Sequence, residues 1–289
     1  MKLLLIIFTV CLAVVILIGG GQFVPISKNL VHYLWWRTTA SGTAHKGVVR
    51  TGGTDIHYRS YGSGPPVLLL HGGLSNRLSW FSQVPWLVEA GRQVILIDSR
   101  GHGDSDLGDK DLSYRLLADD SIQVLDQMRV ERTAVIGWSD GANTALLLAL
   151  HWPQRVTKIV AISGNFDPSG IKPEAKEEDN IHSSGLTYWF KRWWTGAGEK
   201  FLELESKIKK LWQNSPRLSA KDLHQITAPV MVIVGEQDMI TLEHAKKMAE
   251  ILPHGVLEII KGGGHATLIT HASKINNLIR AFLVIPDHP

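Results

Sequence analysis

The chain has 289 residues, of which 44% are hydrophobic and 20% are charged, so we expect a folded globular protein rather than a disordered one. The net charge of +3 is too small to indicate nucleic-acid binding, which requires a concentrated basic stripe. Because Cys11 is the only cysteine, an intrachain disulfide, thiol catalysis and a cysteine-based metal site are excluded.

The first 24 residues contain an uncharged apolar run, Leu3–Ile18, that follows Lys2 and precedes three glycines. A membrane anchor needs roughly 20 apolar residues, and residues 1–24 come close to that length. A cleaved secretory signal is the alternative, although no Ala-x-Ala site is present. We therefore predict a protein that is either anchored to a membrane or exported. The sequence does not determine on which side of the membrane the folded part lies.

Residues 25–46 are predicted to be a linker to the globular part of the chain. Within them, Tyr33–Arg37 combines aromatic and basic side chains. This composition suits a membrane interface, and it also suits packing on the surface of the folded domain.

From residue 47 onward, segments with strand character alternate with segments with helix character. A β-hairpin is predicted over 47–61, with its turn at 51–55. In chain order, further strands are predicted at 66–70, 94–98, 133–136, 158–162, 230–234 and 256–260, and helices at 76–90, 113–128, 143–151, 242–252 and 271–283. This alternation predicts a mainly parallel sheet with helices on both faces.

The alternation stops between residues 163 and 229, and we predict that residues 164–227 form a helical cap inserted into the core. Lys172–Asn180 is charged and reads as a loop, whereas Leu186–Trp194 is strongly aromatic. Glu199–Trp212 has the apolar stripe of an amphipathic helix. So much aromatic surface favours a cap over a solvated linker. A lid that contacts a membrane is the alternative, because Lys207–Lys210 is basic.

The sequence Gly137-Trp138-Ser139-Asp140-Gly141 lies between a predicted strand and a predicted helix. This is the context in which a Gly-x-Ser-x-Gly motif indicates a nucleophile elbow rather than a simple glycine turn. The turn is so sharp that its two outer positions need glycine. It would hold the Ser139 hydroxyl above the sheet edge, at a helix N-terminus that favours developing negative charge.

A serine hydroxyl becomes an effective nucleophile when an imidazole removes its proton and a carboxylate orients that imidazole. Asp238 follows one predicted strand and His265 follows the next, both at the edge where open α/β sheets place their sites. The order Ser139, Asp238, His265 is the order that the elbow motif predicts. Asp167, which also follows a strand, is the alternative acid, while His102 is predicted to be noncatalytic.

Acyl transfer also needs donors for the oxyanion, each worth roughly 2.7–4 kcal/mol. We expect them to be the backbone N–H groups of Asp140 and Gly73. Leu74, Trp138 and the Asp140 side chain are predicted to contact the substrate. The sequence has no phosphate-binding glycine loop and no metal-ligand spacing of His or Cys, so neither a cofactor nor a metal is implied.

Over about residues 47–285 the chain resembles the α/β-hydrolase family. The resemblance rests on five segments: His71–Gly73, Asp98–Ser105, Gly137–Gly141, Gly235–Asp238 and Gly264–His265. It implies an eight-stranded sheet, a core in two parts (47–163 and 228–289) with the cap after the sixth strand, and cofactor-free hydrolysis through an acyl-enzyme. The Asp98–Ser105 segment is itself predicted to be mainly a structural loop near the site.

The elbow looks like that of the valacyclovir-hydrolase-like (biphenyl-hydrolase-like) branch. In that branch the acid after the nucleophile is associated with α-amino-acid esters, which would give Asp140 a substrate ammonium to attract. Ala142 departs from the branch pattern, where a third glycine is usual.

The leading prediction is a serine hydrolase that cleaves small-molecule carboxylic esters of small to medium acyl groups. The alternatives are a ligand-binding receptor on a hydrolase scaffold with little turnover, and an interfacial lipase. The sequence leaves the oligomeric state open.

Overall fold

The computed structural model describes residues 23–173 and 186–284. Its centre is one eight-stranded sheet with the strand order β1-β2-β4-β3-β5-β6-β7-β8. The strands are β1 (His45–Thr51), β2 (Thr54–Tyr61), β3 (Pro66–Leu70), β4 (Gln93–Ile97), β5 (Thr133–Trp138), β6 (Val156–Ile162), β7 (Val230–Gly235) and β8 (Gly255–Ile260). Only β2 pairs antiparallel with its neighbours, β1 and β4; the other pairs are parallel. The predicted mainly parallel sheet is confirmed.

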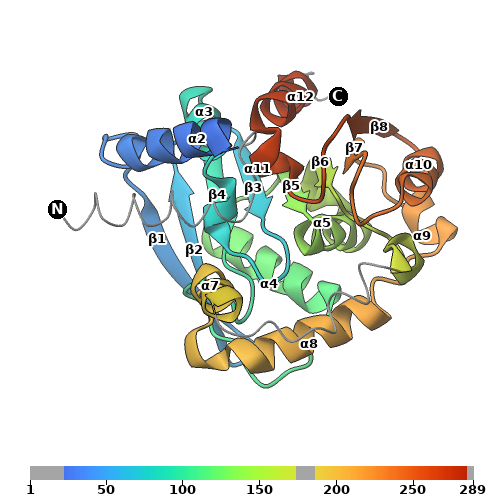
Figure 1. Cartoon of the computed structure of the whole chain (residues 1–289), viewed down its shortest axis with the longest axis horizontal. Coiled ribbons are helices and arrows are strands. Elements are labelled where there is room, and N and C mark those ends of the chain that lie inside the picture. Colours follow the sequence, from blue (N-terminus) through green and yellow to red (C-terminus); the bar gives the residue numbers. More distant parts are fainter. Residues whose placement is uncertain (1–22, 174–185, 285–289) are drawn as a thin grey trace.

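Helices cover both faces of this sheet (Figure 1). They are α2 (Phe23–Trp36), α3 (Val84–Glu89), α4 (Tyr114–Gln127), α5 (Asp140–His151), α7 (Leu186–Thr195), α8 (Phe201–Asn214), α9 (Ala220–His224), α10 (Leu242–Ile251), α11 (Thr267–Thr270) and α12 (Ala272–Val284). In the view of Figure 1, α2, α3 and α12 lie along the upper side and α8 lies along the lower side.

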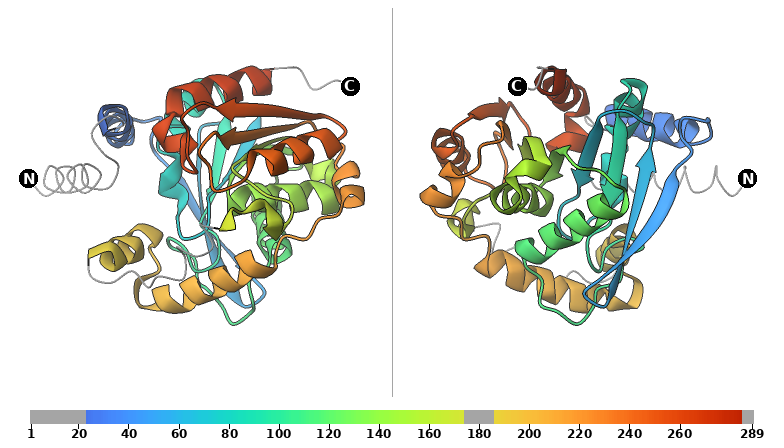
Figure 2. Two further views of the ribbon diagram at one scale, coloured as in Figure 1. Left: turned by 45° about the vertical axis from the view of Figure 1, so that its right-hand side comes forward. Right: turned by 180° about the vertical axis from the view of Figure 1, so that it is seen from behind.

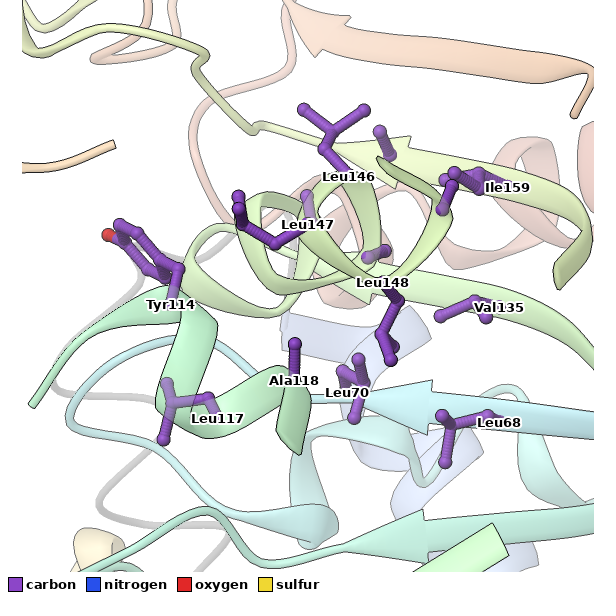
Figure 3. Close-up of a cluster of buried hydrophobic side chains, with 14 of the residues drawn as sticks. Leu68, Leu70, Tyr114, Leu117, Ala118, Val135, Leu146, Leu147, Leu148 and Ile159 are labelled. Atoms are coloured by element: carbon purple, nitrogen blue, oxygen red, sulfur yellow. The ribbon is translucent and has the colours of Figure 1, made fainter. Parts of the chain in front are cut away.

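Alternate residues of the central strands face opposite sides, which gives two separate hydrophobic cores. Leu68 and Leu70 of β3 belong to the core beneath α4, α5 and α10, whereas Val67 and Leu69 belong to the core beneath α2, α3 and α12. In Figure 3, Leu148 of α5 points toward Leu70 of β3, and Leu147 points toward Tyr114 of α4. These buried strands fix the edge from which the site residues project.

The helix α2 occupies much of the range that was predicted to be a linker. Ile26, Leu30, Tyr33 and Trp36 are buried in the second core, at the 3–4-residue spacing of one helix face. Of the two predicted roles for this aromatic segment, Tyr33 and Trp36 therefore have the second, packing against the folded domain. The linker prediction was wrong over α2, because the apolar positions at this spacing belong to a helix that packs on the sheet.

One predicted helix is interrupted. The range 76–90 contains a short 3₁₀ helix, Arg77–Trp80, followed by α3, which starts with Pro85 in its first turn. Proline has no N–H to donate and favours a helix start, so the segment divides there. The helix predicted over 271–283 is confirmed as α12, and the short α11 comes before it.

Within the range predicted as a cap, the structure describes residues 164–173 and 186–227, and it contains α7, α8 and α9. Phe201, Leu204, Ile208 and Leu211 of α8 are buried, as the amphipathic stripe predicts. Most of the charged stretch 172–180 lies outside the described residues.

The predicted anchor or signal, residues 1–24, also lies almost entirely outside the described residues. Among the helices that the structure describes, none is both long and apolar enough to cross a bilayer.

Candidate active site

Ser139 sits at the turn between β5 and α5, with a backbone φ of 53° and ψ of −117°. This is a conformation that costs a non-glycine residue of order 1–3 kcal/mol, and it places the side chain at the N-terminus of α5. A methyl group at Gly141 would overlap the carbonyl oxygen of Leu70, and one at Gly137 would overlap that of Gly141. The close approach of these backbones explains both outer glycines of the motif.

The three predicted triad residues lie together. His265 Nε2 is 2.9 Å from Ser139 Oγ, and His265 Nδ1 is 2.7 Å from Asp238 Oδ1. Trp138 donates its indole N–H to the His265 carbonyl oxygen at 2.8 Å, which holds the backbone of the histidine loop against the elbow. The carboxylate, the imidazole and the hydroxyl thus form one continuous hydrogen-bonded chain.

Asp238 is 1% exposed and accepts several hydrogen bonds. The Ser163 hydroxyl donates to its Oδ2 at 2.6 Å, and the Ile240 N–H donates to its Oδ1 at 3.2 Å. Burial raises the pKa of Asp238, but the hydrogen bond and charge of His265 and the Ser163 hydrogen bond outweigh it and hold that pKa below its usual value. The group is therefore an ionised acceptor that can orient His265.

Asp167, the alternative acid, lies elsewhere. Its side chain accepts the N–H of Ser169 at 2.9 Å and caps a 3₁₀ turn, Pro168–Gly170. The imidazole of His265 faces Asp238 instead. The sequence could not decide between the two acids, because both follow strands at the same edge of the sheet.

A cavity of about 450 Å³ opens beside Ser139 and His265. Its walls come from the elbow, the loop after β6, the helix α8 and the loop after β7. The lining residues are Gly72, Gly73, Trp138, Ser139, Asp140, Asn165, Pro168, Ile171, Lys209, Trp212, Gln213, Met239, Ile240 and His265. Trp138 and Asp140 thus lie where substrate contact was predicted. Leu74 is absent from this lining and packs against the first core, so the structure does not support its prediction.

Two buried histidines hold the segment that carries Gly73. His102 Nε2 accepts the Leu74 N–H at 3.0 Å, and His71 Nε2 accepts the Ser99 N–H at 3.0 Å. Each ring's Nδ1 is paired with a backbone carbonyl oxygen. Both rings must therefore be neutral, with the proton on Nδ1. In this arrangement both ring nitrogens of His102 are hydrogen-bonded to backbone groups, and the ring fixes the loop in which the second oxyanion donor is expected.

These histidines predict a loss of stability in acid. Burial lowers the pKa of His71 to about 3 and that of His102 to about 4, whereas an unfolded imidazole binds a proton below about pH 6.5. Stability is therefore complete above about pH 6.5 and falls as the pH drops towards the folded-state values. We expect the melting temperature to fall between about pH 7 and about pH 5, and to fall less in His102→Gln, whose amide oxygen can accept from Leu74 without titrating. An equal fall in that variant would contradict the assignment for His102.

The Asp140 side chain, 5% exposed, joins the elbow to the cap. Its Oδ1 accepts the Tyr114 hydroxyl and the Trp212 indole N–H, each at 2.8 Å. Its Oδ2 is buried and has no hydrogen-bond partner among the described residues. Burial raises the pKa of Asp140 to about 6, against the effect of the two hydrogen bonds. Asp140 therefore holds α8 over the elbow in addition to any contact with substrate.

Several site residues were not predicted from the sequence. Ser163 carried one weak signal, its place directly after a strand. Trp212 was assigned to the apolar stripe of its helix, and only the fold brings its N–H to Asp140. Lys209 was counted with a basic surface patch, yet it lines the cavity. Within residues 23–173 and 186–284, no cluster of three or more His, Cys, Asp or Glu side chains could hold a metal ion.

Family models, curated proteins and solved structures were compared with the chain, and all three comparisons match hydrolases or the hydrolase fold. Residues 65–190 match the model of the α/β-hydrolase fold, and residues 206–289 match the model described as TAP-like protein. A putative non-heme chloroperoxidase from Synechocystis sp. is 28% identical over 79% of this chain and 95% of its own. A 2-hydroxy-6-oxononadienedioate/2-hydroxy-6-oxononatrienedioate hydrolase from Paraburkholderia phymatum is 29% identical over 85% and 97%. The solved structure of Est816, described as an N-acyl homoserine lactone degrading enzyme, is 27% identical, with a TM-score of 0.67 over 82% of this chain and 100% of that one.

Proposed function

Because the chain belongs to the α/β-hydrolase fold family, we propose that it is a serine hydrolase of carboxylic esters with small to medium acyl groups. The observation that carries the proposal is the hydrogen-bonded chain from Asp238 through His265 to Ser139. It ends at a cavity of about 450 Å³, within the range of small-molecule sites. Apolar walls from Ile171, Trp212 and other side chains suit a short carbon chain.

The chemistry follows from these positions. Ser139 Oγ attacks the ester carbonyl carbon while His265 Nε2 takes its proton, and the N–H groups of Gly73 and Asp140 receive the oxyanion. His265 then gives the proton to the leaving alcohol, which leaves an acyl group on Ser139. Water attacks this acyl-enzyme with His265 again as the base, and the acid and free Ser139 are released. Asp238 keeps the imidazole in the required tautomer throughout.

The test of this function is reaction with a fluorophosphonate, which labels an activated serine, together with turnover of p-nitrophenyl butyrate by the purified chain. We expect labelling and steady turnover. Tight binding of the ester with a single slow turnover would instead support the receptor on a hydrolase scaffold. A folded protein with neither labelling nor turnover would refute the proposal that the chain is a serine hydrolase.

The predicted preference for α-amino-acid esters stays a prediction. Asp140 lines the cavity, which such a preference requires, but its Oδ1 is already bonded to Tyr114 and Trp212. Oδ2 has no hydrogen-bond partner among the described residues, but it is buried, so a substrate ammonium would have to reach a covered atom. Comparison of alanine and propionate esters of one alcohol tests this point.

A second candidate, an esterase that works at a membrane surface, is favoured by exposed apolar side chains. On α2, Val31 is 46% exposed and Trp35 is 64% exposed; on α7, Trp189 is 58% and Trp193 is 44% exposed. Each pair is four residues apart and so lies on one helix face. In both views of Figure 2, blue α2 and yellow α7 lie on the same side of the molecule. The apolar run Leu3–Ile18 precedes α2 in the sequence.

This candidate predicts a surface-specific defect. Replacing Trp35 and Trp189 with alanine should lower hydrolysis of an ester embedded in lipid vesicles by about fivefold relative to a soluble ester, because less apolar area enters the bilayer. The matched control is Ile259→Ala, an exposed apolar position on β8, 43% exposed. Equal rates on vesicles for all three proteins would refute the membrane role of this surface.

A further inference from the structure

The cap helix α8 carries three lysines in four positions, and two of them hold the cap to the core. Lys207 Nζ donates to the carbonyl oxygens of Gly108 at 3.2 Å and Lys110 at 3.2 Å. Lys210 pairs with Asp111 at 2.7 Å. The basic stretch is therefore not a free surface patch, and a membrane-contacting lid is not needed to explain it.

The third lysine, Lys209, is turned the other way and lines the cavity beside Trp212 and Gln213. These positions share one helix face, because three and four residues make about one turn. Trp212 is bonded to Asp140, the residue next to the nucleophile. Lys209 precedes it by three residues, about 4.5 Å along the helix axis. A cation thus lines the same cavity as Ser139 and His265, about one helical turn from Trp212.

The partner of Lys209 within the fold is Glu205, one turn earlier, with 3.5 Å between Nζ and Oε1. Glu205 is 7% exposed and is not among the residues that line the cavity, whereas Lys209 is. An ammonium has three donors, and one carboxylate contact leaves the others for a second acceptor. The Gln213 amide lines the same wall and adds a neutral donor.

We propose that the cavity accepts esters that carry a carboxylate remote from the scissile bond, and that Lys209 binds this carboxylate. The inference deepens the proposed function and rests on it. The chain between the two groups would lie against the apolar walls formed by Ile171, Met239 and Ile240. Monoesters of short dicarboxylic acids have this distribution of polar and apolar groups.

Three ethyl esters of one length test the proposal: ethyl hydrogen adipate (anionic), ethyl hexanoate (neutral) and ethyl 6-aminohexanoate (cationic). We expect kcat/KM to be highest for the adipate. Removing Lys209 alone leaves Glu205 buried without its partner, so the decisive variant is the double replacement Glu205→Gln with Lys209→Met. It should lower the preference for adipate over hexanoate by about tenfold or more, as loss of a charge-assisted contact implies. Lys209→Arg should keep the preference.

The matched control is Lys210→Met, which removes a lysine of the same helix that pairs with Asp111 outside the cavity. Its preference should equal that of the parent. The inference is overturned if the parent prefers hexanoate or the aminohexanoate, or if the double variant keeps the parental preference. In those cases turnover of hexanoate still supports the serine hydrolase. Failure of the parent to hydrolyse any of the three esters, with no fluorophosphonate labelling, would overturn the proposed function as well.

Discussion

Replacing Ser139 with alanine should lower kcat for p-nitrophenyl butyrate by about 10⁶-fold, since removal of a triad nucleophile costs about that much in serine hydrolases. The hydroxyl is the atom that His265 Nε2 contacts at 2.9 Å. Among the described residues that line the cavity there is no second serine, threonine or cysteine to replace this hydroxyl. Fluorophosphonate labelling should vanish together with turnover.

The variant should remain folded, which makes the loss interpretable. Ser139 lies in a strained conformation, at φ 53°, that alanine tolerates no better than serine. Glycine adopts that region freely, so Ser139→Gly should be equally inactive and more stable than Ser139→Ala. Circular dichroism and melting temperatures of the two variants check this. Turnover in Ser139→Ala above about 1% of the parental rate would mean that another group is the nucleophile.

The sheet and the triad could be predicted because each has a local signature. Continuous apolar runs such as 66–70 and 230–234 identify buried parallel strands, and the strand ends then place Ser139, Asp238 and His265 at one edge. The serine turn carries its own sequence motif, although the need for Gly141 also comes from the approach of Leu70 in β3. The sequence could therefore predict that these three residues lie together, which the structure shows.

The cavity walls could not be predicted, since their roles depend on how separate segments meet. Trp212 and Lys209 are ordinary positions of an amphipathic helix until the cap is seated on the elbow. The helix α2 was missed for a related reason. Its buried face is visible in the sequence, but the apolar run immediately before it favoured assignment to a membrane segment and a linker.

Asp140 has one part that its local sequence predicts and another that depends on how separate segments meet. The elbow motif fixes its backbone, because the residue after the nucleophile begins α5. Its side chain depends on Tyr114 of α4 and Trp212 of α8, two helices far apart in the sequence. A role in binding substrate can be guessed from the motif, whereas the connection from the elbow to the cap appears only in the folded structure.

The choice between the two candidate acids gives the second large expected effect. Asp238→Asn should lower kcat by about 10⁴-fold, because an amide no longer holds the imidazole in the tautomer that can accept the serine proton. The same replacement puts an NH₂ group where a carboxylate oxygen accepts donors from Ser163 or Ile240, so a lower melting temperature should accompany the loss.

Asp167→Asn is the matched control, with the same chemical change in an acid that follows a neighbouring strand. An asparagine there can still accept the Ser169 N–H, so the capped turn should persist and activity should stay within about threefold of the parent. Measuring kcat and the rate of fluorophosphonate labelling for both variants separates orientation of His265 from a general effect on folding. A larger loss of kcat in Asp167→Asn than in Asp238→Asn would mean that Asp167 is the acid that orients His265. Because His265 Nδ1 contacts Asp238 in this structure, that result would also require the histidine loop to rearrange in solution.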